Sequence, residues 1–257
     1  MNLKSYPFPI QIPDGVSIED IEKSPLLSNW FSRLDSNAQV SEVKILSVDL
    51  FGKRVGFIEI EVTYQLLNQK SDSRTNNIKK TERIILCGKS CMICPILYAT
   101  DTKELFTVLV HQPRIGSGKI MYEFPAGMTD DSNDYKLTAS RELYEEVGIK
   151  CSPEDMIPLS EIYNRNHPTY YLNYDRFDQH ARFYLVISKM EKAEIMNFEG
   201  KKHGADADEQ IFLHVVPFED SWIYGNDPAT LAAYEMILNV ISCGFLMLLK
   251  TIYIKYI

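Results

Sequence analysis

The sequence is poor in positive charge. Its 257 residues include 27 lysines and arginines against 35 aspartates and glutamates, which gives a net charge of −8. Affinity for a nucleic-acid backbone comes from clustered lysine and arginine side chains, and the sequence has no such cluster. A nucleic-acid partner is therefore not expected, and an anionic substrate would need cations concentrated at its own site.

Cysteine is also scarce, and the number of cysteines is odd. The five are Cys87, Cys91, Cys94, Cys151 and Cys243. A CxxC pair occurs at positions 91 and 94, but no second pair of cysteines or histidines follows at zinc-finger spacing. We therefore expect small apolar residues in and around strands rather than metal ligands. The opening residues MNLKSYPFPIQIPDG lack the apolar core of a secretory leader, so we expect a reducing, cytoplasmic location.

The sequence has no apolar run long enough to cross a bilayer. The longest extends from Val240 to Leu249, well short of the ~20 residues that a membrane span requires. Lys250 and Lys255 follow it. We expect the tail, residues 240–257, to form a packed terminal helix, and a membrane-tethered enzyme is the less favoured alternative. The sequence gives this tail no clear role.

Residues 1–83 are predicted to form an N-terminal extension of helix and strands. A proline-rich, irregular lead precedes an amphipathic helix in SPLLSNWFSRL, residues 24–34. Further on, Ile58, Ile60 and Val62 alternate with polar residues, which is the pattern of a half-buried strand, and Gly52 marks a hairpin turn. The polar stretch 68–83 is interpreted as a long loop or as the edge of another hairpin, and it marks the predicted domain boundary.

Residues 84–239 are predicted to form the main domain, in which helices and strands alternate. Strands are expected at 85–99, 105–112, 180–190 and 210–218. One helix should end at Gly148, a favourable C-cap residue, and another should begin at Asp227 and Pro228. The expected class is α/β, in the form of an α+β mixed sheet flanked by helices.

The segment RELYEEVGIK places Glu142, Glu145 and Glu146 on one face of the first helix. Like charges at this spacing repel each other, so a cation is expected to hold them together. The preceding EFPAGMTDD contains a Pro-Ala-Gly turn whose carbonyl oxygens could face the acids. Oxygen ligands of this kind suit Mg²⁺, and Mn²⁺ could substitute.

Together these residues resemble the Nudix box. Gly127 and the run from Arg141 to Ile149 match its defined positions, whereas Asn133 stands where the family has glutamate. The amide of Asn133 cannot neutralise an arginine as a carboxylate does, although Asp130, Asp131 or Asp134 could stand in. The resemblance implies a Nudix α/β/α sandwich with an N-terminal β-rich extension. It also implies Glu142, Glu146 and the Ala126 carbonyl as metal ligands, Glu145 on metal or water, and Arg141 as the residue that orients the acids.

The resemblance extends to the ADP-sugar pyrophosphatase branch, in particular to plant-type ADP-sugar diphosphatases. The segments that carry it are DLFGKRVGF, GKIMYEFPAGM and FLHVVPFEDSW. It implies cleavage of ADP-glucose or ADP-ribose to AMP and a sugar phosphate, by a homodimer built through the N-terminal strands. The alternatives are hydrolysis of UDP-glucose or another nucleoside diphosphate derivative, and a Nudix-fold sensor that binds nucleotides without turnover.

Several residues outside the box are candidates for substrate contacts and catalysis. Cations just before the metal loop suit a diphosphate, and Arg114 is the preferred phosphate ligand. The predicted substrate-binding set is Arg114, Lys119 and Glu123. On the loop GKKHGADADEQIF, Glu209 is the first choice for a catalytic base, ahead of Asp206 and Asp208.

Other polar and aromatic residues have weaker claims. Tyr170 and Tyr171 could stack on a base or sugar, or could simply pack their own loop down. His203 is expected on a loop surface and His214 within a strand, and neither is assigned a catalytic role.

Overall fold

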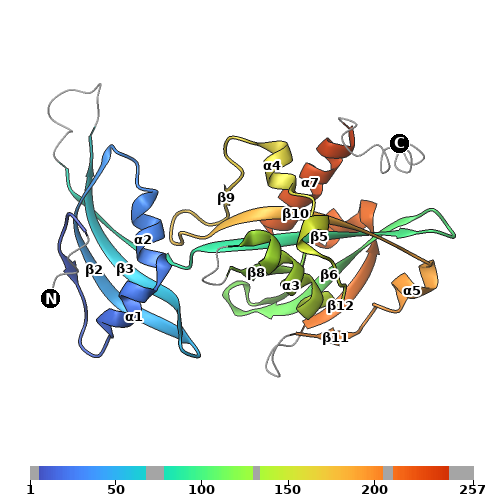
Figure 1. The fold of residues 1–257 in the computed structure, drawn as a ribbon, viewed down its shortest axis with the longest axis horizontal. Coiled ribbons are helices and arrows are strands. Elements are labelled where there is room, and N and C mark those ends of the chain that lie inside the picture. The colour runs from blue at the N-terminus through green and yellow to red at the C-terminus, as the bar shows by residue number, and fades with distance from the viewer. Residues whose placement is uncertain (1–5, 68–77, 130–133, 205–210, 243–257) are drawn as a thin grey trace. The chain divides into compact units, whose positions relative to one another are not determined.

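The computed structural model describes residues 6–67, 78–129, 134–204 and 211–242. Packing divides the chain into two compact units. The first comprises Met1–Lys89 together with Asn173–His180, and the second comprises Ser90–Leu172 and Ala181–Ile257 (Figure 1). The division falls after Lys89 rather than at the predicted residue 83, and the return of Asn173–His180 to the first unit was not predicted.

The first unit is built on a four-stranded sheet. Its strands, in their order across the sheet, are β1 (Ile10–Gln11), β2 (Ala38–Phe51), β3 (Arg54–Leu66) and β4 (Lys80–Leu86). β1 runs parallel to β2, and the remaining pairs are antiparallel. The predicted hairpin turn at Gly52 is confirmed, with φ at 62°. Because β4 pairs with β3, residues 80–83 of the predicted 68–83 loop belong to a hairpin strand.

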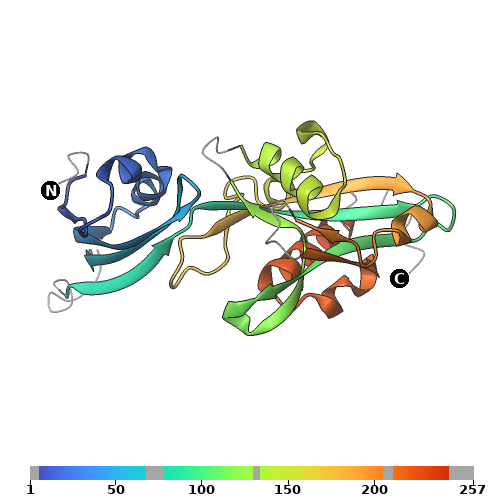
Figure 2. The ribbon, with the colours of Figure 1, turned by 90° about the horizontal axis from the view of Figure 1, so that it is seen from below.

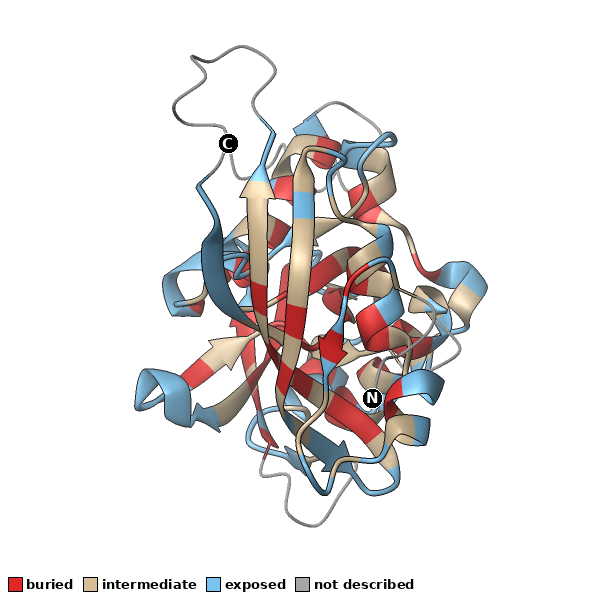
Figure 3. Cartoon of the chain, turned by 90° about the vertical axis from the view of Figure 1, so that its left-hand side faces the viewer, coloured by how far each residue is buried: buried red, intermediate tan, exposed pale blue. Residues whose placement is uncertain are grey.

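Two helices pack on this sheet, α1 (Ile18–Lys23) and α2 (Pro25–Ser32). Serine side chains cap both helices at their N-termini. Ile58, Ile60 and Val62 are buried with Trp30 in one core, which confirms the predicted alternation along β3. Figure 3 shows buried positions recurring along the strands. The prediction of an irregular N-terminal lead was only partly right, because this segment contains β1 and α1.

The predicted strand 85–99 is wrong as a single element. β4 ends at Leu86, and β5 (Lys89–Ala99) belongs to the other sheet. The break occurs at Gly88, whose φ of 77° favours glycine and whose added Cβ would lie 2.8 Å from Leu26 Cδ2. The Asp178 carboxylate accepts hydrogen bonds from the N–H groups of Cys87 and Gly88, at 2.6 and 2.8 Å. A buried acid thus satisfies the backbone where the chain leaves the first sheet.

The second unit is built on an eight-stranded mixed sheet. Its main path runs β11-β12-β6-β5-β10-β9, with β7 paired to β6 and β8 paired to β5. The remaining strand bounds are β6 (Leu105–Arg114), β7 (Lys119–Glu123), β8 (Ala126–Met128), β9 (Tyr170–Tyr171), β10 (His180–Met190), β11 (Lys202–His203) and β12 (Ile211–Pro217). The strands predicted around 105–112, 180–190 and 210–218 are therefore confirmed.

Helices cover both faces of this sheet. They are α3 (Tyr135–Val147), α4 (Leu159–Tyr163), α5 (Lys192–Met196), α6 (Ser221–Tyr224) and α7 (Pro228–Ser242), with short 3₁₀ turns at Ile115–Ser117, Pro153–Asp155 and Phe218–Asp220. Figure 2 shows α3 on one face and α7 on the other. The helix α3 packs against one hydrophobic core cluster, and α7 packs against the other. The predicted mixed sheet between helices, with an extra N-terminal sheet, is confirmed.

The CxxC pair illustrates how the sheet separates these two cores. Cys91 is buried in the cluster beneath α3, whereas Cys94 is buried in the cluster beneath α7. Side chains three residues apart on a strand point to opposite faces, so these two thiols cannot chelate one ion. The interpretation of these cysteines as small apolar residues is confirmed, and Cys243 lies outside the described residues.

The last described helix begins where the sequence predicted. Asp227 Oδ1 accepts hydrogen bonds from the N–H groups of Ala229 and Thr230, both at 2.9 Å, and so caps α7. In the part of the chain that the structure describes, no helix is long and apolar enough to cross a membrane. The tail from residue 243 onward, and the helix predicted there, lie outside the described residues.

Candidate functional site

The helix that carries the acidic cluster has well-defined ends. The Asp134 side chain accepts hydrogen bonds from the N–H groups of Lys136 and Leu137 and caps the first turn of α3. Gly148, with φ at 81°, ends the helix as predicted, and its N–H donates to the Tyr144 carbonyl. The apolar stripe of α3 is buried against the sheet, which leaves the glutamates on another face.

One arginine holds two of the three glutamates. Arg141 Nη2 lies 2.8 Å from Glu142 Oε1, and Arg141 Nη1 lies 2.7 Å from Glu145 Oε2. The like charges are therefore partly balanced within the helix itself. This geometry agrees with an orienting role for Arg141, a role that stays a prediction.

The third glutamate is buried against the preceding loop. Glu146 is only 6% exposed, and its Oε2 accepts a hydrogen bond from the Ala126 N–H at 2.9 Å. Ala126 begins β8, which pairs with β5 at the centre of the sheet. This hydrogen bond fixes the helix to the loop that precedes it. The carbonyl of Ala126, predicted as a metal ligand, keeps that role only as a prediction.

Gly127 allows α3 to lie this close to the loop. A Cβ at this position would fall 2.0 Å from Glu142 Cδ and 2.1 Å from Glu142 Oε1. No real Cβ contact is that short, so any larger residue would displace the carboxylate. Position 127 therefore requires a glycine, because no side chain fits there.

A thiol lies beneath the same loop. Cys91 Sγ is 3.7 Å from the Gly127 carbonyl oxygen, to which the thiol donates. Burial, followed by the negative charge of Glu142, raises the pKa of Cys91 to about 12. The thiol therefore stays protonated near neutral pH, and this excludes Cys91 as a nucleophile.

A second charged pair lies on the β6–β7 hairpin. Arg114 Nε is 2.9 Å from Glu123 Oε2, and Arg114 Nη2 is 2.6 Å from the same oxygen. Burial tends to lower the pKa of Arg114, but the charges of Glu123, Glu146 and Asp227 outweigh burial and raise the pKa. The Arg114 guanidinium thus lies within the electrostatic reach of the acidic helix. Lys119 lies opposite Arg114 where β6 pairs with β7. Its side chain is exposed and forms no ion pair with any described residue.

Several features around this pair were missed in the sequence. The rings of His111 and Tyr122 stack with centroids 4.3 Å apart, and His214 and Tyr224 pack beside them. Burial, followed by the charge of His214, lowers the pKa of His111, so His111 is neutral near pH 7. Only the pairing of β6 with β7 and β12 brings these rings together. No local sequence signal could have revealed them.

Some predicted residues lie elsewhere or outside the described chain. Tyr170 packs edge-on against Phe183 at 5.7 Å, so it holds its own loop down, whereas Tyr171 is 51% exposed. His203 was predicted on a loop surface, which is wrong. It lies in β11, and its ring is so close to Gly148 that a Cβ there would meet it at 2.8 Å. The acids Asp206, Asp208 and Glu209, together with Asn133, Asp130 and Asp131, lie outside the described residues.

The acidic cluster has the ligand chemistry of a divalent-cation site. Glu142, Glu145 and Glu146 supply hard carboxylate oxygens on one helix face beside a loop that a glycine keeps open. Within the described ranges, no three side chains of histidine, cysteine, aspartate or glutamate are grouped closely enough to hold a metal ion. The three glutamates therefore have the donor chemistry for a cation but are not grouped around one here, and binding would require Glu142 and Glu145 to turn away from Arg141.

Comparisons with known proteins bear on the family and the fold of the chain. A sequence model of the NUDIX domain matches residues 92–234. The chain is 30% identical to Nudix hydrolase 14, chloroplastic, of Arabidopsis thaliana over 244 residues, which cover 86% of this chain and 74% of the relative. The fold resembles a crystal structure described as an ADP compounds hydrolase, with a TM-score of 0.55 and 13% identity over 82% of this chain and 97% of that one. This last likeness bears on the fold alone.

We predict that Gly127→Ala destabilises the second unit because the new methyl group occupies the position of the Glu142 carboxylate. Overpacking of this kind costs about 1–3 kcal/mol of unfolding free energy. Gly116→Ala is the matched control, since a Cβ at Gly116 meets no atom within 4 Å. Urea unfolding of both variants tests the contact. Equal stability of the two variants would contradict the close approach of α3 to the loop.

Proposed function

The chain belongs to the Nudix hydrolase family, and from that premise we propose that it cleaves the diphosphate of an ADP-sugar, ADP-glucose or ADP-ribose, to AMP and a sugar phosphate. One observation carries the proposal. Glu142 and Glu146 of α3 lie against Ala126–Met128, and the Arg114 guanidinium is within the electrostatic reach of Glu146. Acids that can hold a cation, beside an arginine that can meet a phosphate, suit a diphosphate substrate better than a neutral one.

The β6–β7 hairpin supplies the proposed phosphate contact. Glu123 holds Arg114 through Nε and Nη2, so the guanidinium keeps a fixed direction before substrate arrives. With the described residues, Nη1 makes no hydrogen bond and is the nitrogen that can donate to a phosphate oxygen. Lys119, on the same hairpin, adds an exposed positive charge in an acidic protein. Glu123 thus acts by positioning Arg114.

The acidic helix supplies the proposed metal site. The Nudix family typically uses a divalent metal, and here Glu142, Glu146 and the Ala126 carbonyl would hold Mg²⁺ or Mn²⁺. When bound, such an ion neutralises the diphosphate and lowers the pKa of a water molecule. Arg141 orients Glu142 and Glu145 through its two ion pairs. Glu209 is proposed as the base that takes the proton of the attacking water.

A panel assay tests the substrate assignment. Purified protein with Mg²⁺ is given ADP-ribose, ADP-glucose and UDP-glucose, and nucleoside monophosphate and sugar phosphate are measured separately. We expect AMP from the ADP-sugars at a kcat/KM at least tenfold above that for UDP-glucose, a preference of about 1.4 kcal/mol. A preference for UDP-glucose would contradict the ADP-sugar assignment. Tight nucleotide binding with no product would instead favour the sensor.

We also propose that the protein forms a homodimer through the segment Val40–Leu67. The hairpin of β2 and β3 exposes large apolar side chains, with Leu50 54% and Phe51 45% exposed at its turn. Burying such surface stabilises an interface by roughly 25 cal/mol per Å². Sedimentation at micromolar concentration should show a dimer that Leu50→Glu weakens. Leu231→Glu, at a 44% exposed leucine of α7, is the control and should leave the dimer intact. A monomeric wild type would contradict the proposal.

A further inference from the structure

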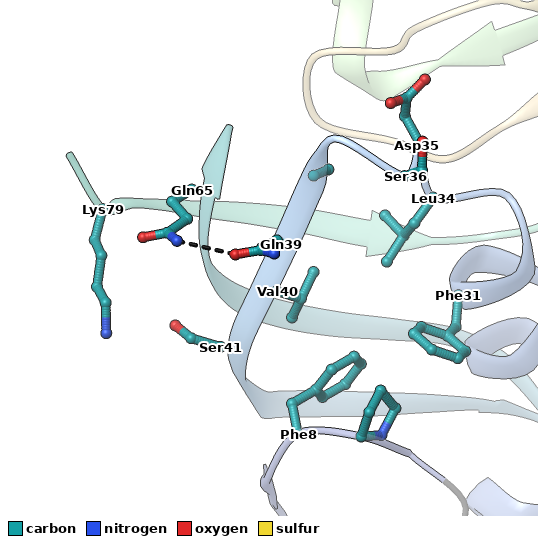
Figure 4. A pocket seen from close by; sticks show the side chains of 12 residues that line it. Phe8, Phe31, Leu34, Asp35, Ser36, Gln39, Val40, Ser41, Gln65 and Lys79 are labelled. Atoms are coloured by element: carbon teal, nitrogen blue, oxygen red, sulfur yellow. Dashed lines mark hydrogen bonds between the residues drawn. The ribbon is translucent and has the colours of Figure 1, made fainter. Parts of the chain in front are cut away.

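The first unit contains a pocket that the proposed hydrolase chemistry does not use. Its volume is about 550 Å³, within the range of small-molecule sites. It lies between the end of α2, the start of β2 and the residues just before β4 (Figure 4). All of its lining residues belong to the first unit, whereas the acidic cluster belongs to the second.

One wall of the pocket is apolar. Phe31, Leu34 and Val40 pack against the core of the first unit with one side and remain half-buried. Phe8 supports Phe31 from below, with the two rings edge to face at 5.2 Å. A ligand that covered this wall would remove apolar surface from water, which favours a molecule with a ring or an aliphatic body.

The opposite side of the pocket carries amides. Gln65 Nε2 donates a hydrogen bond to Gln39 Oε1 at 3.0 Å, across the paired strands β2 and β3 (Figure 4). This bond orients both side chains. The Gln39 amide nitrogen can donate to a polar group of a ligand, and the Gln65 oxygen can accept from one.

The pocket has one charged side chain at each end. Asp35, at one end of the pocket, accepts a hydrogen bond from the Asn37 N–H at 2.8 Å and points away from the two glutamines (Figure 4). Lys79, at the other end, forms no ion pair with any residue that the structure describes. Asp35 stays negatively charged at its own end, so an anionic group is best placed at the Lys79 end, beside Gln65 (Figure 4).

We propose that this pocket binds a small amphipathic monoanion, with its ring or aliphatic body on Phe31, Leu34 and Val40 and its carboxylate on Lys79. The Gln39 amide nitrogen donates a hydrogen bond to the same carboxylate. The site is separate from the diphosphate site and does not depend on the substrate of the hydrolase.

Calorimetry of the full-length protein tests the proposal with a matched pair of probes, 3-phenylpropionate and its neutral amide, 3-phenylpropanamide. The two share the same apolar body and differ in charge. We expect the carboxylate to bind at least tenfold more tightly than the amide. Its binding should shift the side-chain amide NMR signals of Gln39 and Gln65. Equal affinity for the two probes, or no binding of either, would overturn the proposal.

Two variants with matched controls locate the binding. Lys79→Gln should weaken the carboxylate about tenfold and leave the amide unchanged, whereas Lys80→Gln, next to it on the exposed start of β4, should change neither. Gln39→Trp should fill the pocket and abolish binding of both probes, whereas Ser28→Trp, at an exposed residue of α2 outside the pocket, should not. Thermal unfolding confirms that each variant is folded. Equal effects of the two lysine variants, or of the two tryptophan variants, would place the binding elsewhere.

Discussion

The hydrogen bond from the Ala126 N–H to the Glu146 carboxylate is the constraint on which the site depends. It joins the most buried acid of α3 to the first residue of β8, and β8 is in turn paired with β5 in the centre of the sheet. A buried carboxylate is costly unless a donor satisfies it, so this contact also makes it possible for Glu146 to lie there at all. The next residue, Gly127, must be a glycine because there is no room for a side chain beside Glu142.

Near this contact, two arginines form ion pairs with three glutamates. Arg141 holds Glu142 and Glu145, and Arg114 holds Glu123 within the electrostatic reach of Glu146. Glu123 keeps Arg114 directed, and Arg141 keeps two acids in place. In an acidic protein, this arrangement offers both a carboxylate cluster for a divalent ion and a guanidinium for a phosphate, close to one loop.

The sequence predicted the parts of the fold that rest on local rules. The helix ending at Gly148 follows from its left-handed cap and its apolar stripe, and β3 follows from the alternation of Ile58, Ile60 and Val62. The acidic face of α3 could likewise be predicted, because the spacing of the three glutamates in the sequence places them on one face of the helix. The ion pairs that Glu142 and Glu145 form with Arg141 depend on side-chain conformations, which only the structure shows.

What could not be predicted depends on contacts between distant segments. The run 85–99 has the composition of one strand, and only the space limit at Gly88 shows where it changes sheets. Asp178 joins the first unit because it reaches the N–H groups of Cys87 and Gly88 and pairs with Arg33 at 2.7 Å. Nothing near Asp178 in the sequence indicates these partners. The ring cluster at His111 and Tyr122 depends in the same way on which strands pair.

The central claim is that Glu142, Glu146 and the Ala126 carbonyl hold a divalent ion. It is tested most directly by comparing the Mg²⁺-induced rise in thermal midpoint between wild type and Glu146→Gln. The amide keeps an oxygen for the Ala126 N–H but loses the charge that binds metal. Saturating Mg²⁺ at 100 times its Kd should stabilise wild type by about 2.7 kcal/mol, and Glu154→Gln, at an exposed acid of the Pro153–Asp155 turn, should behave in the same way.

Glu146→Gln should lose the Mg²⁺-induced rise while its midpoint in chelator stays at or slightly above that of wild type, because one of three repelling charges is gone. A wild-type response to Mg²⁺ in this variant, or a collapse of its midpoint in chelator, would show that the acids serve structure and not a metal.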